Sequence, residues 1–322
     1  MNESVQHPLV IGIDAGGTRL RAYLADGTGR VLGSGTGGPG NALSVGRADL
    51  TRHLARALDA AVPVGLRGSV VAAAGGFAGA AEDAGPEWGQ RLAALCLAEA
   101  LALTGMKGVA SEVYGDVEVA FASAPGAPSD GLVLVAGTGA AAGRVADRRC
   151  VRTSDGGGWL LGDSGSGFWL GHMALRAVLR ALDERGPWTS LADAVPAHCV
   201  PGHVSPRAPW PERGRLKEQL VGWAHSRPPV ALALLSPLVV TAADTGDGVA
   251  RSLLDEAAAE LAATVGALAP RPGEPLVVTG GLVGPEGPLL ERLTERTRAT
   301  GLRITAVRDG GAGAVALARL LV

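Results

Sequence analysis

The chain has 322 residues, a length that fits two domains better than one. Hydrophobic residues make up 47%, enough to fill two cores, and the formal net charge of −2 argues against a nucleic-acid surface, which needs clustered lysine and arginine. The 49 glycines are scattered at turns without a three-residue period, so collagen and plain disorder are both poor interpretations.

Strands and a helix alternate in the first part of the chain. Residues 9–13 form an apolar run typical of a buried strand, and residues 20–24 and 30–33 predict two more strands of a meander that turns at Asp26-Gly27. Leucine and alanine at helical spacing predict a helix over residues 47–62. The same patterns predict a strand at 70–74, a helix at 87–103, a strand at 109–114, and a helix that begins at or just after Asp116.

A proline- and glycine-rich segment, Pro125–Asp130, is the best candidate for a domain boundary, because the strand–turn–strand pattern restarts after it. The predicted domains are residues 1–125, with a C-terminal segment of about 309–322 folding back onto them, and residues 126–308. The second part contains predicted helices at about 166–183 and 249–268, a strand at 276–279, a proline-rich surface loop at 196–211, and a last helix at about 311–321.

The repeated order predicts the fold class. A three-stranded meander followed by alternating helices and strands occurs twice, which is typical of a mixed α/β fold built by duplication. Two such domains leave a cleft between them, where small molecules usually bind.

Two glycine turns follow buried strands at equivalent places in the two halves. The first glycine turn is Gly16-Gly17-Thr18, followed by Arg19, and the second is Gly137-Thr138-Gly139. Glycine lets backbone N–H groups approach a phosphate closely and permits the positive φ of tight turns. Neither turn matches the P-loop or the dinucleotide fingerprint, and either alone would be an ordinary hairpin turn. Together they predict two backbone surfaces that face one polyphosphate.

Two aspartates stand beside predicted strand ends. Asp14 could hold Mg²⁺ through water, or it could simply cap its own turn. Asp116 could be a general base or a helix N-cap, and the two roles are compatible because capping fixes the orientation of the carboxylate.

Two further glycine-rich segments carry weaker signals. Gly280-Gly281, here the third glycine turn, follows a buried strand and could let the flat ring of an adenosine lie against the backbone. The loop Gly156–Gly167 contains Trp159 and Asp163, and Asp163 could accept hydrogen bonds from sugar hydroxyls. A metal site at His198, Cys199 and His203 is disfavoured because the proline-rich segment lacks a fourth ligand.

Taken together, these segments resemble the BadF/BadG/BcrA/BcrD-type ATPase family of the actin/hexokinase-like superfamily, and within it the N-acetylglucosamine kinase branch. The resemblance covers nearly the whole chain, and the order and separation of the matching pieces make it specific. The pieces are Asp14–Thr18, Gly38–Ala42, Asp116, Gly137–Gly139, Gly162-Asp163 with Gly165-Ser166, and Gly280-Gly281.

The resemblance implies two ribonuclease-H-like domains, each a mixed sheet flanked by helices, that close on ATP with Mg²⁺ and a small amino sugar. It implies that Asp116 is the base and also contacts the sugar, together with Asn41, Gly158 and Asp163. The first two glycine turns and Arg19 would hold phosphates. The family is commonly dimeric, so a homodimer is expected.

Several positions depart from the family pattern. Arg19 replaces a lysine, Gly115 an asparagine, Gly157 a tryptophan, Ser164 an acidic residue, and Ala74 a serine. Most of these changes fall on the sugar side, so the nucleotide site is better defined by the sequence than the sugar.

The expected function is therefore an ATP-dependent kinase that transfers the γ-phosphoryl group to the 6-hydroxyl of N-acetylglucosamine. Glucosamine or another hexosamine is the alternative acceptor. An ATPase that activates an acyl-CoA dehydratase or reductase would need cysteines that bridge an iron–sulfur cluster. A non-catalytic sugar sensor is disfavoured by the presence of both Asp14 and Asp116.

Cysteine usage, the N-terminus and hydropathy predict a cytoplasmic protein with no membrane or nucleic-acid partner. Cys96, Cys150 and Cys199 are too few and too far apart for a disulfide framework, and no CxxC pair is present. The N-terminal segment Met1–Ser4 contains an acidic residue, Glu3, where a signal peptide needs positive charge. The apolar run Val230–Ala243 is shorter than the roughly 20 residues that a membrane-spanning helix needs.

Overall fold

A computed structural model describes residues 8–17, 19–80 and 88–322. Thr18, a predicted member of the first glycine turn, lies outside the described residues.

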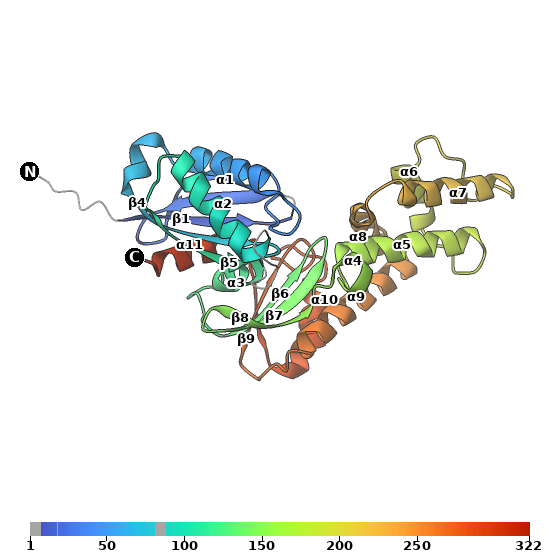
Figure 1. Ribbon diagram of the computed structural model, residues 1–322. Helices are drawn as coiled ribbons and strands as arrows, with labels where there is room; N and C mark the ends of the chain where they lie inside the picture. Colours follow the sequence, from blue (N-terminus) through green and yellow to red (C-terminus); the bar gives the residue numbers. More distant parts are fainter. Residues whose placement is uncertain (1–7, 18, 81–87) are drawn as a thin grey trace, which may run out of the picture.

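The first part of the chain builds a mixed sheet with the strand order β3-β2-β1-β4-β5 (Figure 1). The central strand β1 pairs antiparallel with β2 and parallel with β4, so the predicted meander passes directly into the parallel part of the sheet. The elements are β1 (Leu9–Ala15), β2 (Leu20–Ala25), β3 (Val31–Gly37), α1 (Arg47–Ala61), the 3-10 helix Val64–Ser69, β4 (Val70–Phe77), α2 (Gly89–Leu103), β5 (Ala110–Gly115) and α3 (Asp116–Ala122).

The second part repeats this topology, with the strand order β10-β9-β6-β7-β8. The strands are β6 (Gly131–Ala136), β7 (Ala140–Ala146), β8 (Arg149–Asp155), β9 (Pro275–Thr279) and β10 (Arg303–Ala306). The helices are α4 (Gly158–Leu161), α5 (Gly167–Leu182), α6 (Leu191–Cys199), α7 (Glu212–His225), α8 (Ser236–Asp244), α9 (Gly248–Gly266), α10 (Leu290–Thr297) and α11 (Gly311–Arg319), with 3-10 helices at Pro229–Leu235 and Arg298–Thr300. Two mixed sheets of equal topology confirm the predicted α/β class.

Some predicted elements were wrong in detail. The segment 196–211 is not all loop, because Pro196 lies inside α6. The loop 156–167 contains the helical turn α4, and β3 runs on to Gly37. Helices α6, α7, α8 and α10 and strand β10 were not predicted. Helix α7 buries only Leu216, Leu220 and Trp223, so its apolar pattern is sparse.

Helix α3 packs against both sheets. Val119 and Ala122 join the core formed with the first sheet and α11, whereas Ala120 and Phe121 pack against Val133 and the other buried residues of the second sheet. Helices α1 and α2 cover the opposite face of the first sheet, and α5, α6, α8, α9 and α10 contribute to the core of the second. Helix α3 therefore lies between the two sheets.

Helix α11, red in Figure 1, lies against β1 and α3, although it follows β10 in sequence. Glycines permit this close packing. A Cβ atom at Gly12 would lie 2.5 Å from the backbone nitrogen of Val315, and one at Gly313 would lie 2.0 Å from the carbonyl oxygen of Val119. The end of the chain thus returns to the first sheet.

In the described part of the chain, no single helix is long and apolar enough to cross a bilayer. The segments Pro229–Asp244 and Gly248–Gly266 meet that criterion only as a pair, which is bent by 119°.

Gly313→Ala should destabilise the protein by about 1–3 kcal/mol, because the added methyl group would push α11 away from α3. Urea unfolding at equilibrium measures this change. The control is Gly222→Ala in α7, where no atom lies within 4 Å of the new Cβ and a gain of about 0.5–1 kcal/mol is expected. Equal effects of the two substitutions would contradict the packing argument.

Candidate active site

The first glycine turn is open on one side. The N–H of Gly16 donates to the carbonyl oxygen of Arg19 at 3.0 Å, and its own carbonyl accepts from Gly40 N–H at 2.9 Å. No atom lies within 4 Å of a Cβ placed on Gly17, and the Arg19 side chain is exposed. Neither Gly16 nor Gly17 has a positive φ, so backbone strain does not account for glycine here.

The second and third glycine turns pack against each other. A Cβ atom at Gly280, whose φ is +102°, would lie 2.3 Å from the carbonyl oxygen of Ala136 at the end of β6. The N–H of Gly137 donates to Gly139 across the second turn at 2.9 Å, and Gly167 at the start of α5 donates to the Gly137 carbonyl at 2.8 Å. The turns after β6 and β9 therefore form one surface.

A cavity of about 600 Å³ opens beside this surface. Its walls are small or apolar, which suits a flat aromatic ring. The residues that line it are Gly137, Thr138, Gly167, Ala233, Ser236, Pro237, Val240, Thr241, Gly281, Leu282 and Pro288. Sequence reasoning missed the contribution of residues 233–241, because their apolar run was considered only as a membrane span.

Two carboxylates meet at the end of β1. Asp14 and Asp309 each lie 3.7 Å from a guanidinium nitrogen of Arg21, and Asp309 also accepts hydrogen bonds from Tyr23 Oη at 3.2 Å and from Gly311 N–H at 3.0 Å. Burial, and then the charge of Asp309, raise the pKa of Asp14 to about 6, against a smaller lowering by the Gly310 N–H and Arg21.

Asp309 was not among the predicted site residues. The sequence offered one indication that Asp309 belongs to the site, because it stands just before two glycines at the start of a predicted helix. It also lines a second cavity, of about 510 Å³, together with Arg21, Gly280 and Gly281. Gly281 lines both cavities, so the apolar cavity and the cavity beside Asp309 adjoin at the third glycine turn.

Asp116 is the first residue of α3, and Gly115 is the N-cap. Its carboxylate accepts a hydrogen bond from Val117 N–H at 2.9 Å. Burial raises the pKa of Asp116 above the ordinary aspartate value; the Val117 N–H opposes the shift, and the Glu118 charge adds to it. A carboxylate whose pKa is raised binds a proton more tightly than an exposed aspartate does.

Asp116 lines a cleft of about 480 Å³ between the two sheets, called the Asp116 cleft below. One wall comes from the first sheet, α2 and the start of α3, and the other comes from β7, β8 and the residue after β8. The lining residues are Phe77, Gly79, Ala80, Gln90, Gly115, Asp116, Val117, Glu118, Ala141, Arg149, Cys150, Thr153, Asp155 and Gly156.

Three predicted sugar-binding residues do not line this cleft: Asn41, Gly158 and Asp163. The Oδ1 atom of Asn41 accepts from Leu43 N–H at 2.8 Å. The same atom would lie 2.7 Å from a Cβ atom placed on Gly79, which lines the cleft. Gly158 begins α4.

Asp163 instead supports the second glycine turn. It accepts from Ala140 N–H at 3.1 Å, and burial raises its pKa. Asp155, which sequence reasoning did not select, lines the cleft and accepts from the N–H groups of Asp163 and Ser164, both at 2.8 Å.

Among the residues that the structure describes, no three His, Cys, Asp or Glu side chains gather as a metal site would require. The acidic pair Asp14 and Asp309 is compatible only with a metal that takes most of its ligands from elsewhere. Mg²⁺ is such an ion, because it keeps several waters and binds substrate phosphates.

Two sheets of equal topology with one helix packed between them define an actin-like ATPase fold. The family model described as the BadF/BadG/BcrA/BcrD ATPase family matches residues 11–315. The chain belongs to this family of ATP-using proteins, which confirms the resemblance inferred from its motifs.

Two curated proteins that are similar to this chain are named as sugar kinases. The chain is 30% identical over 197 residues to an N-acetyl-D-glucosamine kinase of Dictyostelium discoideum, covering 57% of this chain and 56% of that protein. It is 30% identical over 162 residues to an N-acetylmuramic acid/N-acetylglucosamine kinase of Clostridium acetobutylicum, covering 48% and 47%. The chain thus matches about half the length of these relatives.

The fold is also similar to a solved structure from Chromobacterium violaceum, described as a candidate N-acetylglucosamine kinase. The TM-score is 0.72 at 24% identity, covering 97% of this chain and 99% of that one. At this identity the likeness shows the fold.

Asp14→Asn should stabilise the nucleotide-free protein at pH 7.5 but not at pH 4. With the folded-state pKa raised to about 6, the folded state binds more protons than the unfolded state between about pH 4 and 6, so stability falls as pH rises through this window. Removing the charge should recover about 1–3 kcal/mol at pH 7.5. Urea unfolding at the two pH values measures the difference.

Asp255→Asn, which removes an exposed carboxylate paired with Arg292, is the control and should show no such gain. An equal effect of Asp14→Asn at both pH values would contradict the assignment.

Proposed function

We propose that this protein is an ATP-dependent amino-sugar kinase that transfers the γ-phosphoryl group to the 6-hydroxyl of N-acetylglucosamine. The observation that carries the proposal is the partly buried Asp116 carboxylate at the start of α3, which has a raised pKa and lines a cleft between the two sheets. The names of the curated relatives support the amino sugar as acceptor.

ATP would bind across the three glycine turns. The apolar cavity beside Gly281 would take the adenine ring, while the first and second glycine turns and Arg19 would face the phosphates. Gly280 would let the third turn stay close to β6, so that the second and third glycine turns face the nucleotide together.

Mg²⁺ would lie by Asp14, held through water, with Asp309 as the second carboxylate. The fit is electrostatic, because the charge of Asp309 adds to the raised pKa of Asp14, and the Arg21 guanidinium lies 3.7 Å from each carboxylate. When bound, Mg²⁺ neutralises charge on the β- and γ-phosphates.

Asp116 would accept the proton of the sugar hydroxyl as that oxygen attacks the γ-phosphorus in line. Asp116 would also orient the sugar, with Asn41, Gly158 and Asp163 as further contacts. Because those three residues stand outside the Asp116 cleft, their contact with the sugar would require closure.

The units that close would be the predicted domains, residues 1–125 with about 309–322, and residues 126–308. The packing of α11 against β1 and α3 supports placing the C-terminal segment with the first unit. Closure would exclude water that otherwise hydrolyses ATP. A homodimer and a cytoplasmic location stay predictions.

ATP consumption tests the proposed function against glucose, glucosamine, N-acetylglucosamine, N-acetylmannosamine and N-acetylmuramate. The highest kcat/KM should belong to N-acetylglucosamine, and product analysis should place the phosphate on the 6-oxygen. A preference for glucosamine or another hexosamine would change the proposed acceptor but would still support a hexosamine kinase. No turnover with any of the five sugars would refute an amino-sugar kinase.

Asp116→Asn should lower kcat by about 10²–10⁴-fold, because an amide cannot accept the hydroxyl proton. ATP affinity should change less than about threefold, which corresponds to under about 0.7 kcal/mol, because the glycine turns that would hold the phosphates are unaltered. Steady-state kinetics and calorimetry of ATP binding measure the two quantities. Activity that survives the substitution would show that Asp116 is not the base.

A further inference from the structure

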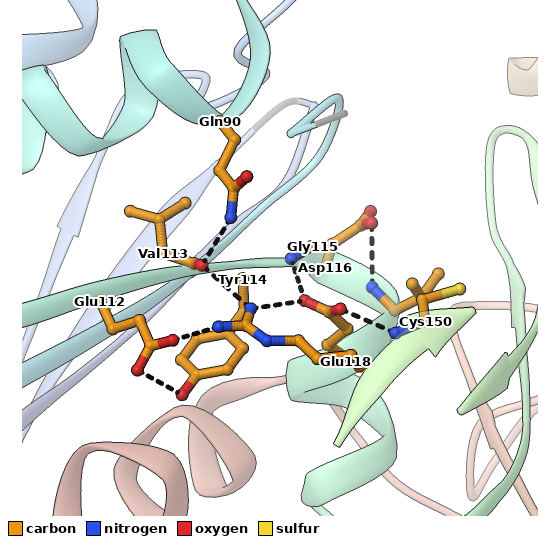
Figure 2. A network of polar contacts seen from close by, with 10 residues as sticks. Gln90, Glu112, Val113, Tyr114, Gly115, Asp116, Glu118 and Cys150 are labelled. Atoms are coloured by element: carbon orange, nitrogen blue, oxygen red, sulfur yellow. Dashed lines mark hydrogen bonds and ion pairs between the residues drawn. The ribbon is translucent and has the colours of Figure 1, made fainter. Parts of the chain in front are cut away.

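Glu118 joins the start of α3 to the second sheet. Its Oε2 atom accepts from Gly115 N–H at 2.7 Å, and its Oε1 atom accepts from Cys150 N–H in β8 at 2.8 Å (Figure 2). The side chain is only 10% exposed. Both carboxylate oxygens are therefore used, and they are used on backbone groups of different sheets.

Arg149, the first residue of β8, strengthens this connection. Its guanidinium lies 3.6 Å from Glu118, donates to the Val113 carbonyl at 3.3 Å and pairs with Glu112. It also lies over the Tyr114 ring, 4.2 Å from the centroid. Figure 2 shows Glu112, Tyr114 and Glu118 around the end of β5. The beginning of β8 is thus fixed to the end of β5 by side-chain contacts.

Helix capping alone does not explain Glu118. A glutamate at the third helical position that accepts the N-cap N–H completes a capping arrangement, and this needs only the Gly115 hydrogen bond. The second bond, to Cys150, reaches a strand of the other sheet. A buried carboxylate is costly unless its lone pairs are satisfied, so this second bond is a specific feature of the interface between the sheets.

The connection also surrounds the reacting group. Gly115 and Glu118 flank Asp116 in sequence, and Arg149 and Cys150 line the Asp116 cleft from the opposite wall. We propose that Glu118 is a positioning residue that holds the Gly115–Asp116 turn against β8, so that Asp116 and the β8 wall of the cleft keep one fixed geometry. The inference rests on the proposed function, in which Asp116 accepts the proton of a sugar hydroxyl.

Glu118→Gln tests the proposal with little change of shape. A glutamine oxygen can accept one of the two N–H groups, while its NH₂ group must face the other donor. The kcat should fall about 10–100-fold, because displacement of a catalytic group by about 1 Å has that effect. The KM for ATP should stay within about twofold, because the glycine turns that would bind ATP lie elsewhere.

Glu274→Gln is the matched control. Glu274 is 12% exposed, pairs with Arg144 at 2.6 Å and accepts from Arg271 N–H at 3.0 Å, but it does not line the Asp116 cleft. It should lose stability without losing kcat. An equal fall of kcat in both variants would overturn a positioning role for Glu118.

A second measurement does not depend on any sugar. Cys96 and Cys199 are buried, whereas Cys150 is partly exposed on β8. Burial raises the pKa of the Cys150 thiol and the Glu118 charge adds to this shift, so the rate at which N-ethylmaleimide alkylates Cys150 is divided by the thiolate fraction of each variant. The corrected rate reports how firmly that strand is held. Mass spectrometry should show faster Cys150 alkylation in Glu118→Gln, and a wild-type rate in Glu274→Gln. An unchanged Cys150 rate in Glu118→Gln would overturn the proposal whatever the kinetics show.

The two proposals can fail separately. If the wild-type protein phosphorylates none of the hexosamines, yet Cys150 becomes more reactive in Glu118→Gln, the kinase assignment fails and the connection between α3 and β8 stands.

Discussion

The packing of α3 between the two sheets is the constraint on which the site depends. Ala120 and Phe121 are buried against the second sheet, and Val119 and Ala122 are buried with the first sheet and α11. A seven-residue helix is too short to be stable alone, so its conformation comes from these contacts. Asp116 is the first residue of this helix, and its position is therefore set by both halves of the molecule at once.

This arrangement places two carboxylates, Asp14 and Asp116, in surroundings that disfavour their charged forms, which selection for stability alone does not explain. Burial raises the pKa of Asp14 and of Asp116, so ionising either carboxylate works against folding. The helix N-cap Asp247 behaves differently: it accepts hydrogen bonds from Ser190 and Ala250, and its pKa is lowered. Perturbed acids in a cleft are typical of functional sites. Burial also raises the pKa of Asp163, which holds the second glycine turn, so the raised pKa supports a chemical role for Asp14 and Asp116 only together with their places in the site.

The sequence predicted the features that depend on local patterns. Apolar strands, helical spacing and the duplicated meander were enough to predict the fold class. The structure gives the reason for the glycine at 280, which is its contact with the Ala136 carbonyl. Features that depend on contacts across the fold were missed. Asp309 joins Asp14 only because α11 returns to β1, and Asp155 replaces Asp163 in the cleft because Asp163 turns toward Ala140. Linear spacing contains no signal for either event.

The departures from the family pattern can now be separated by position. Ala74 is completely buried in the core beside Tyr114, so it cannot touch a sugar directly. Gly157 is tightly surrounded, since a Cβ atom there would lie 3.3 Å from the carbonyl carbon of Leu161, and a tryptophan would require this turn to move. Gly115, by contrast, lies in the cleft wall itself. Sugar selectivity should therefore depend on that wall and on how β8 is held against α3, more than on Ala74.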